Sequence, residues 1–458
     1  MISKHIFRAY DIRGTVPDEL NERSVELIGR ALGTLSKRKG EPRVLVARDG
    51  RLSGPSLAAA LMRGVRLSGC DVVDVGVVPT PLLYFATKTM GISSGLMLTG
   101  SHNPSHYNGI KSVIAGSTLF GDDVMALYES IIAQNFETGQ GALSQQTHLI
   151  EDYITRVCSD IVLARPLKIV VDCGNGVAGA VAPLLFKRLG CHVIPLYCDI
   201  DGNFPNHHPD PSKADNLQDL IARVLAEKAD IGLAFDGDGD RLGVVTGDGN
   251  IIWPDRQLIL LSQDILARHK GAAIIYDVKC TNNLKKAIEA AGGKAIMSRT
   301  GHSYVKATLL ETGALLAGEM SGHIFFQERW YGFDDGLYTA ARLLEVLTKD
   351  ARTPSAVFKD VPDSLNTPEL QCTISDARKF LFMEALVKNA DFDGGKLCTI
   401  DGLRVDFQDG WGLVRASNTT PCLVMRFEAD NPASLQRIQS AFKSHLLAID
   451  PTLELPYL

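Results

Sequence analysis

Several features that would place the chain in a membrane, secreted or nucleic-acid-binding class are missing from its sequence. No apolar run approaches the roughly 20 residues that a membrane-spanning helix needs. The nine cysteines are scattered and never spaced C-x-x-C, which favours reduced thiols over a disulfide framework or a zinc site. There are 47 basic and 53 acidic residues, so the net charge of −6 disfavours a general nucleic-acid binder. Because residues 1–14 contain no apolar signal-peptide core, we expect a cytoplasmic protein with neither a membrane nor a nucleic-acid partner.

The length and composition suit several globular domains. The chain has 458 residues, 45% of them apolar and 22% charged, and domains of roughly 100–200 residues predict three or four of them. Residues 43–51, 168–176 and 272–280 begin alike, each with a β-branched run that ends in charged or glycine-rich residues. Each is followed by a helix-compatible stretch and another apolar run, such as residues 72–78 and 192–196. Strands that alternate with helices predict three tandem related α/β domains with mixed, largely parallel sheets.

The C-terminal part of the chain has a different pattern, with closely spaced strands and no helix between them. Residues 397–407 and 411–430 contain these strands, and a helix is predicted over Pro432–Ile449. This order is typical of an antiparallel α+β domain. We therefore expect four domains, which comprise residues 1–146, 147–249, 250–362 and 363–458.

Three aspartates with glycines between them, Asp236, Asp238 and Asp240, follow an apolar run directly. Carboxylates this close repel one another unless a positive charge lies among them, and the glycines allow a turn tight enough to bring them together. Hard oxygen ligands of this kind suit Mg²⁺ or Ca²⁺. An EF-hand loop is excluded, because Arg241 and Gly247 stand where it needs glycine and glutamate. An aspartyl-phosphate phosphatase usually has threonine in place of Asp240, and the preceding apolar run disfavours a simple solvated turn.

The second of the β-branched segments, residues 168–176, contains the start of a competing motif. Gly174, Gly176 and Gly179 follow a predicted strand with the G-x-G-x-x-G spacing of a dinucleotide-binding turn, and Asp199 ends the next strand. Asp172 stands two residues before the first glycine, where its charge would repel a pyrophosphate. We therefore favour a closely packed strand-to-helix turn, and a nucleotide-binding oxidoreductase stays an alternative.

Three polar loops could bind a sugar phosphate. In TGSHNP, Ser101 stands where an apolar run ends, either as a nucleophile or as part of an ordinary turn. In GEMSGH, Glu319, Ser321 and His323 alternate, so an extended backbone would point all three to one side, where they match the hydroxyls of a sugar. In RASNTTP, Arg415 precedes hydroxyls and turn N–H groups that can hold a phosphate. Taken alone, each of the first two loops could equally be a polar turn without a function; a polar hairpin loop is also possible for the third, but Arg415 at its base favours phosphate binding.

Together these loops fit phosphoryl transfer through an enzyme-bound phosphate. Serine is a poor nucleophile by itself and needs a metal to offset charge and a base for the incoming hydroxyl. Lys111, ten residues after Ser101, or His302 could transfer that proton, and a lysine in this role must have a lowered pKa. A metal-dependent sugar-phosphate phosphatase and a non-catalytic sugar-phosphate sensor stay as alternatives.

The motifs TGSHNP, DGDGDR, GEMSGH and RASNTTP occur in an order and at spacings that resemble those of the α-D-phosphohexomutases. The match covers essentially the whole chain and is closest to the bacterial phosphomannomutase/phosphoglucomutase group. The resemblance implies a heart-shaped enzyme of four domains, each of which gives one loop to a central cleft. It implies reversible phosphoryl transfer between C1 and C6 of mannose or glucose phosphates through a phosphoserine and a hexose 1,6-bisphosphate, in a protein that we expect to be monomeric.

The resemblance also implies a role for individual residues. Ser101 would carry the phosphate and, with Asp236, Asp238 and Asp240, would bind Mg²⁺. Glu319 and Ser321 would bind the sugar's 3- and 4-hydroxyls with His323 close by, which predicts tolerance of both glucose and mannose. The phosphate that does not react would be held by Arg415, Ser417, Asn418 and Thr419. The other expected cleft residues are Tyr10, Arg13, Lys111, Arg241, Lys279 and His302, of which Lys111, Arg241 and His302 would act in catalysis.

Overall fold

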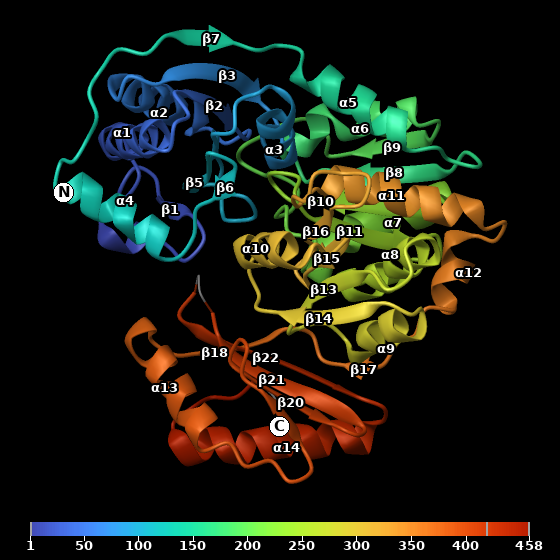
Figure 1. Cartoon of the computed structure of the whole chain (residues 1–458). Coiled ribbons are helices and arrows are strands. Elements are labelled where there is room, and N and C mark those ends of the chain that lie inside the picture. The colour runs from blue at the N-terminus through green and yellow to red at the C-terminus, as the bar shows by residue number, and fades with distance from the viewer. Residues whose placement is uncertain (1, 418–419, 457–458) are drawn as a thin grey trace.

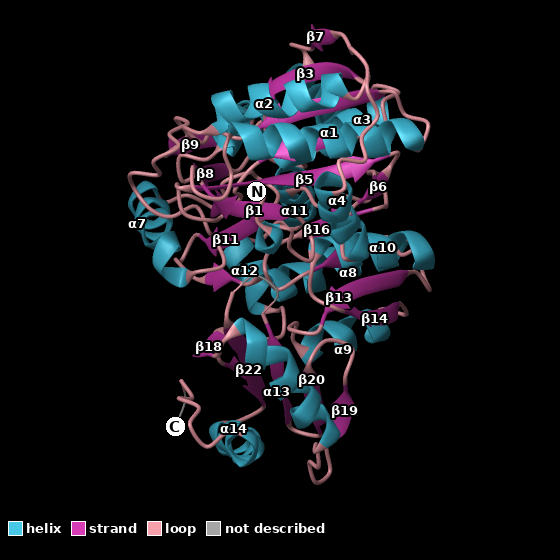
Figure 2. Ribbon diagram, turned by 90° about the vertical axis from the view of Figure 1, so that its left-hand side faces the viewer, coloured by secondary structure: helices cyan, strands magenta, loops and turns pink. Residues whose placement is uncertain are grey.

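The structure, a computed structural model, describes residues 2–417 and 420–456 and contains four β-sheets surrounded by helices (Figure 1). Sheet 1 contains strands β1–β7, sheet 2 contains β8–β12, sheet 3 contains β13–β16 and sheet 4 contains β17–β22. Sheets 1 and 2 lie at the top of Figure 1, sheet 3 lies below sheet 2, and Figure 2 shows sheet 4 as a separate lobe at the bottom. Each sheet is therefore built from one continuous stretch of the chain.

Sheets 1 to 3 repeat one arrangement of four strands. A central strand has a parallel neighbour on each side, and the second of these neighbours turns back into an antiparallel fourth strand. In this order the strands are β2 (Arg43–Arg48), β3 (Asp71–Val77), β4 (Gly95–Leu98) and β5 (Tyr107–Ile114) in sheet 1; β8 (Lys168–Asp172), β9 (His192–Leu196), β10 (Ile231–Phe235) and β11 (Leu242–Thr246) in sheet 2; and β13 (Ala273–Asp277), β14 (Lys294–Ser298), β15 (Leu316–Gly318) and β16 (Ile324–Phe326) in sheet 3. The predicted repetition of related α/β units with mixed sheets is confirmed.

Helices cover these three sheets, and shorter strands extend two of them. The helices are α1 (Glu22–Arg38), α2 (Gly54–Leu67), α3 (Thr80–Thr89), α4 (Asp122–Ile132), α5 (Leu149–Asp160), α6 (Ala182–Arg188), α7 (Gln218–Glu227), α8 (Pro254–Arg268), α9 (Asn282–Ala290), α10 (His302–Thr312), α11 (Gly336–Lys349) and α12 (Pro354–Lys359), with 3-10 turns η1 (Lys4–Ile6), η2 (Val177–Ala180) and η3 (Ala214–Leu217). The shorter strands are β1 (Ile12–Thr15), β6 (Ser117–Thr118), β7 (Leu143–Gln145) and β12 (Ile251–Ile252). No helix built from the described residues combines the length and the apolar character that crossing a bilayer requires.

Sheet 4 is antiparallel throughout, as predicted for the α+β unit. Its strands are β17 (Leu365–Asn366), β18 (Leu370–Thr373), β19 (Lys396–Cys398), β20 (Leu403–Phe407), β21 (Gly410–Ala416) and β22 (Cys422–Ala429), and its helices are α13 (Asp376–Lys388) and α14 (Pro432–Ile449). Helix α14 has the predicted bounds, because Asn431 accepts a hydrogen bond from Ser434 N and Pro432 occupies the first helical position. The expected domain divisions stay a prediction; β12 pairs with β11, so sheet 2 continues past residue 249.

One hydrophobic core runs through sheets 1, 2 and 3, whereas sheet 4 has a core of its own. An aromatic cluster shows how the larger core is joined. The ring of Trp330 stacks on Tyr338 of α11 with centroids 4.0 Å apart, and it lies 6.0 Å from Phe85 of α3 and 5.8 Å from Tyr153 of α5. Because close-packed interiors resist deformation, this shared core fixes the first three sheets relative to one another.

The turn between the third and the fourth strand of the repeat carries a predicted functional motif in every case. The β4–β5 turn carries Ser101, the β10–β11 turn carries the three aspartates, and the β15–β16 turn carries residues 319–323. In each sheet this turn follows the carboxyl end of a parallel strand, which is where open α/β sheets bind ligands. The repeated topology therefore places all three motifs at equivalent edges of their sheets.

Candidate active site

Ser101 lies directly beside the acidic turn. Its hydroxyl oxygen is 3.1 Å from Asp236 Oδ2 and 3.2 Å from His102 Nδ1. Gly237 permits this approach, because a Cβ there would overlap the carbonyl oxygen of Ser101. The backbone of Ser101 itself has a φ of +48°, in the left-handed region, which turns its side chain toward sheet 2. The predicted nucleophile and the predicted metal loop thus share one site, although Ser101 and Asp236 are 135 positions apart in the chain.

Two buried residues that the sequence did not single out hold the Ser101 turn. The guanidinium of Arg51, whose side chain is fully buried, donates four hydrogen bonds of 2.6–2.9 Å to backbone carbonyl oxygens of the turn. Asp49 Oδ2 accepts from Arg51 Nε at 3.1 Å and from Thr99 Oγ1 at 2.8 Å. The available signal was the polar segment RDGR at the end of β2, because neighbouring parallel strands bring their carboxyl ends together.

Lys111, on β5, supplies the positive charge that three close carboxylates need. Its Nζ lies 2.7 Å from Asp238 Oδ2 and 2.6 Å from Asp240 Oδ2. Burial disfavours the charged ammonium, but the two carboxylates outweigh burial and raise the pKa of Lys111 well above its usual range. The lowered pKa expected of a lysine that transfers a proton is therefore not found, and Lys111 is a buried cation that balances the acids.

The acidic turn fits a divalent cation. One oxygen from each of Asp236, Asp238 and Asp240 lies within 4.8 Å of the others. Asp238 Oδ1 and Asp240 Oδ1 are buried, and neither has a hydrogen-bond partner among the described residues. Burial and then the charges of Asp240 and Asp238 raise the pKa of Asp236 well above its usual range, which reflects an excess of negative charge. Buried hard oxygen atoms that lack a hydrogen-bond partner suit Mg²⁺ or Ca²⁺.

The glycine-rich turn after β8 supports the acidic turn from the other side. Val177 N donates to the carbonyl oxygen of Gly237 at 3.1 Å. A Cβ on Gly179 would overlap the carbonyl oxygen of Cys198, so the turn has no room for a larger residue. The carboxylate of Asp172 is paired with His207, whose Nε2 lies 3.0 Å from Asp172 Oδ2. The closely packed turn that we favoured over a dinucleotide-binding loop is confirmed.

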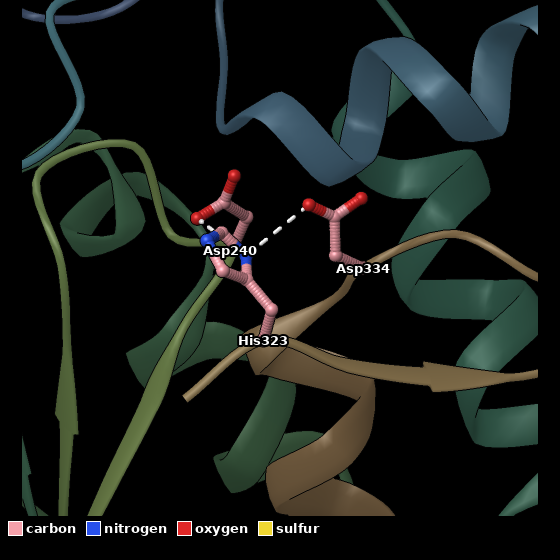
Figure 3. Close-up of side chains that lie close together, drawn as sticks. All are labelled: Asp240, His323 and Asp334. Carbon is pink, nitrogen blue, oxygen red and sulfur yellow. Dashed lines mark ion pairs between the residues drawn. The ribbon is translucent and has the colours of Figure 1, made fainter. Parts of the chain in front are cut away.

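His323 links the acidic turn to sheet 3 (Figure 3). Its Nδ1 lies 3.2 Å from Asp334 Oδ2 and 3.5 Å from Asp240 Oδ1. On the other side of the ring, Nε2 accepts a hydrogen bond from Arg241 Nε at 3.0 Å, so a neutral ring carries its proton on Nδ1. Asp334 also forms an ion pair of 3.0 Å with Lys306. Asp334 was not expected from the sequence, because it lies outside the four motifs.

The backbone at Glu319, Ser321 and His323 is not extended, although the three side chains do face one cavity. The chain reverses between β15 and β16, where Glu319 N donates to His323 O at 2.9 Å and Gly322 N donates to Glu319 O at 3.0 Å. Gly322 has a φ of +103°, which glycine adopts without a steric penalty. Burial raises the pKa of the Glu319 carboxyl. A tight turn, rather than strand alternation, therefore brings these groups together.

A cavity of about 540 Å³ adjoins these turns. Each of the four stretches of chain that form the sheets contributes residues to its lining. Ser101, Lys111 and the three aspartates do not line it and are buried. Ser101 Oγ lies 3.2 Å from His102 Nδ1, and Asp236 Oδ2 lies 3.7 Å from Arg241 Nε; His102 and Arg241 both line the cavity. Asn418 and Thr419 lie outside the described residues. The expected cleft residues that line the cavity are Tyr10, Arg13, Arg241, Lys279, His302, Glu319, Ser321, His323, Arg415 and Ser417. The charged or titratable lining residues that the sequence did not reveal are Asp11, His102, Asp210, Lys213, Glu369 and Arg426.

Cations gather at the sheet 4 side of this cavity. Arg415 Nε donates to Asp401 Oδ2 at 2.9 Å, and Lys279 Nζ lies 3.0 Å from Glu369 Oε2. The charge of Lys279 lowers the pKa of Glu369 to about 2. Ser417 Oγ lies 2.7 Å from the hydroxyl of Thr420 within the β21–β22 loop. Guanidinium, ammonium and hydroxyl groups on one wall suit a phosphate.

Four family models match the chain in succession. They describe phosphoglucomutase/phosphomannomutase α/β/α domains I, II and III, which match residues 4–138, 150–249 and 253–365, and the C-terminal domain, which matches residues 369–445. The chain belongs to the phosphoglucomutase/phosphomannomutase family. The resemblance inferred from the four motifs is therefore confirmed.

Members of this family match over almost their entire length. The chain is 55% identical over 452 residues to a phosphomannomutase/phosphoglucomutase of Pseudomonas aeruginosa, a match that covers 99% of this chain and 97% of that protein. It is 52% identical over 447 residues to a phosphoglucomutase of Neisseria meningitidis, with 97% of each chain covered. The X-ray structure of a phosphoglucomutase/phosphomannomutase family protein from Burkholderia thailandensis matches with a TM-score of 0.95 at 53% identity, over 100% of both chains. The expected four-part family fold is thus confirmed.

Proposed function

We propose that the protein is a hexose-phosphate mutase that moves a phosphoryl group reversibly between C1 and C6 of glucose and mannose phosphates. The observation that carries this proposal is the Ser101 hydroxyl, which lies 3.1 Å from Asp236 beside a cavity rich in cations. Of the relatives named above, one is named a phosphomannomutase/phosphoglucomutase and another a phosphoglucomutase, and nothing supports the alternative of a sugar-phosphate phosphatase.

In the proposed reaction, Ser101 carries the phosphoryl group between two half-reactions. The phosphorylated serine gives its group to a sugar monophosphate, and the resulting hexose 1,6-bisphosphate turns over within the cavity. The other phosphate then returns to Ser101, so that the phosphate count of the enzyme is restored. Lys111, which is 2.7 Å from Asp238, and Arg241, which is 3.7 Å from Asp236, hold positive charge close to the serine during both transfers.

His302 is the proposed proton acceptor for the incoming sugar hydroxyl. It is the first residue of α10 and lines the cavity, with its ring 5.5 Å from that of His323. Burial and then the charge of Lys306 lower the pKa of His302 well below its usual range, so the ring is neutral and free to accept a proton at neutral pH. His302 thus has the lowered pKa that a proton acceptor needs, whereas the pKa of Lys111 is raised.

The remaining site residues bind and orient the substrate in this proposal. Ser101, Asp236, Asp238 and Asp240 would hold Mg²⁺, which when bound offsets charge on the transferring phosphoryl group. Glu319 and Ser321 bind the sugar's 3- and 4-hydroxyls, and the loop of Arg415 and Ser417 holds the phosphate that does not react. Because neither set of contacts depends on C2, we expect both glucose and mannose phosphates to be substrates. We also propose that the protein is cytoplasmic, and that it is a monomer because all four sheet-forming stretches of one chain contribute residues that line the cavity.

The variant Ser101→Ala tests the proposal, with Ser105→Ala on the exposed part of the same turn as its control. Glucose 1-phosphate is supplied, and glucose 6-phosphate and inorganic phosphate are measured separately. The parent and the control should form glucose 6-phosphate almost without free phosphate, and Ser101→Ala should lose on the order of a thousandfold or more in kcat. Intact mass should show one phosphoryl group on the parent that the Ser101 variant lacks. Near-normal turnover by Ser101→Ala, or free phosphate as the main product, would overturn the proposal.

A further inference from the structure

Two cysteines from neighbouring strands meet beside the turn that supports the acidic loop. Cys173 directly follows β8, and Cys198 lies two residues past the end of β9, the parallel neighbour of β8. Their sulfur atoms are 3.6 Å apart and share a hydrogen bond. Both are free thiols. A disulfide has its sulfur atoms about 2 Å apart. A bond between these two therefore requires the 3.6 Å between the sulfur atoms to shorten by about 1.6 Å.

The two thiols differ in access and in acidity. Cys173 is completely buried, whereas Cys198 is partly exposed. The hydrogen bond between the two sulfur atoms lowers the pKa of Cys198 and raises that of Cys173. The thiol that an oxidant can reach is therefore also the better nucleophile, and the buried thiol lies where it can complete a disulfide.

We propose that Cys173 and Cys198 are a reversible oxidation site, and that the disulfide between them slows the mutase reaction. The oxidant is a peroxide, with hydrogen peroxide as the simplest case. The Cys198 thiolate attacks one peroxide oxygen, the O–O bond breaks, and the departing hydroxide leaves as water after it takes up a proton, so that Cys198 becomes a sulfenic acid. The Cys173 sulfur then attacks the Cys198 sulfur, the S–O bond breaks, and a second water leaves with the Cys173 proton. Two thiols and one peroxide thus give one disulfide and two waters, and a thiol reductant reverses the change.

The effect on the reaction rests on the proposed function and follows from what the two cysteines touch. The carbonyl oxygen of Cys173 accepts a hydrogen bond of 2.7 Å from Gly176 N. A Cβ on Gly176 would lie 2.9 Å from the carbonyl oxygen of Gly237, the residue between two of the metal-loop aspartates. The backbone of Cys198 packs against Gly179 so closely that a Cβ there would overlap it. Both cysteines therefore hold the same turn, and the turn holds the acidic loop.

A close-packed interior transmits such a movement instead of absorbing it. If the two sulfur atoms draw together, the turn between residues 174 and 180 must shift with them. Displacement of a catalytic group by about 1 Å can lower a rate by up to about a hundredfold. We therefore expect the disulfide to reduce kcat rather than to unfold the protein.

The test uses the full-length protein, first reduced and then treated with hydrogen peroxide. Peptide mass spectrometry after thiol alkylation should find one peptide pair, joined through Cys173 and Cys198, with two hydrogens fewer than the separate peptides. The kcat with glucose 1-phosphate should fall about tenfold or more and should return after treatment with dithiothreitol. The variants Cys173→Ala and Cys198→Ala should show neither change. Cys158→Ala is the matched control, because Cys158 is also partly exposed but has no thiol partner in the part of the chain that the structure describes.

Each contrary result overturns the proposal. If the parent forms no Cys173–Cys198 peptide pair, there is no oxidation site. If the pair forms but kcat does not change, the link to the acidic loop is wrong. If peroxide lowers kcat equally in Cys198→Ala, the loss arises elsewhere. A reduced parent without mutase activity would count against the proposed function alone, because the peptide masses still decide whether the disulfide forms.

Discussion

Replacing Arg51 by lysine tests how the Ser101 turn is held in place. The Arg51 guanidinium donates one hydrogen bond to Asp49 and four to backbone carbonyl oxygens of the turn. The side chain is fully buried, so water cannot replace a bond that is lost. Lysine keeps the positive charge but offers three donors where arginine offers five. At least two of the five hydrogen bonds must therefore disappear.

The size of the effect follows from those two bonds. Hydrogen bonds of charged groups contribute roughly 1.5 kcal/mol or more each, so the free energy of unfolding should fall by about 3 kcal/mol or more. The rate should fall as well, because the lost hydrogen bonds hold the turn that carries Ser101. We expect one of them to be the bond of 2.8 Å to the carbonyl oxygen of Ser101 or a bond to another carbonyl oxygen of that turn. A loss of about a hundredfold in kcat corresponds to a displacement of about 1 Å. Since Arg51 does not line the cavity, KM for glucose 1-phosphate should change little.

Urea unfolding and steady-state kinetics measure these two quantities. Arg48→Lys is the control, because Arg48 ends the same strand but is only half-buried and donates a single hydrogen bond of 3.3 Å to the carbonyl oxygen of Asp49. We expect the control to stay within about 0.5 kcal/mol of the parent. If Arg51→Lys unfolds at the same urea concentration as the parent and keeps its kcat, the buried guanidinium does not position the turn.

Three further changes test other parts of the fold. Gly179→Ala places a Cβ on the carbonyl oxygen of Cys198 and should lower the free energy of unfolding by roughly 1–3 kcal/mol; an unchanged urea midpoint would contradict this. Burial raises the pKa of Asp335 to about 7. The unfolded chain releases this proton near pH ~4, whereas the folded protein still keeps it. The free energy of unfolding therefore falls as the pH rises between these two values. Asp335→Asn removes that titration, so its melting temperature should rise relative to that of the parent across this pH window. If the melting temperatures of parent and variant instead change in parallel with pH, the raised pKa of Asp335 is wrong. EDTA should abolish mutase activity and lower the melting temperature only slightly, because Lys111 lies 2.6–2.7 Å from two of the buried acids; unfolding in EDTA would refute this.

The local elements were predictable from the sequence because their causes are local. Strand β9 and helix α14 have the predicted bounds, since apolar periodicity and helix-capping residues act within a few positions of each element end. The motif around Ser101 and the three aspartates were found for the same reason, because polar and glycine residues directly follow apolar strands in both. The order of strand and helix patterns also gave three related α/β units followed by an antiparallel one.

Only the tertiary structure decided which distant groups meet. Lys111 and Asp238 are 127 positions apart, and the sequence could not show that the two would pair and raise the pKa of the lysine instead of lowering it. Arg51 and Asp334 stand in no motif, and they matter because sheet order and a shared core bring them to the Ser101 turn and to His323. A sequence records which side of each strand or helix is apolar, but the free energy of burial depends on which apolar faces cover one another. Charges on those faces are therefore paired, and their pKa values set, only when the chain has folded.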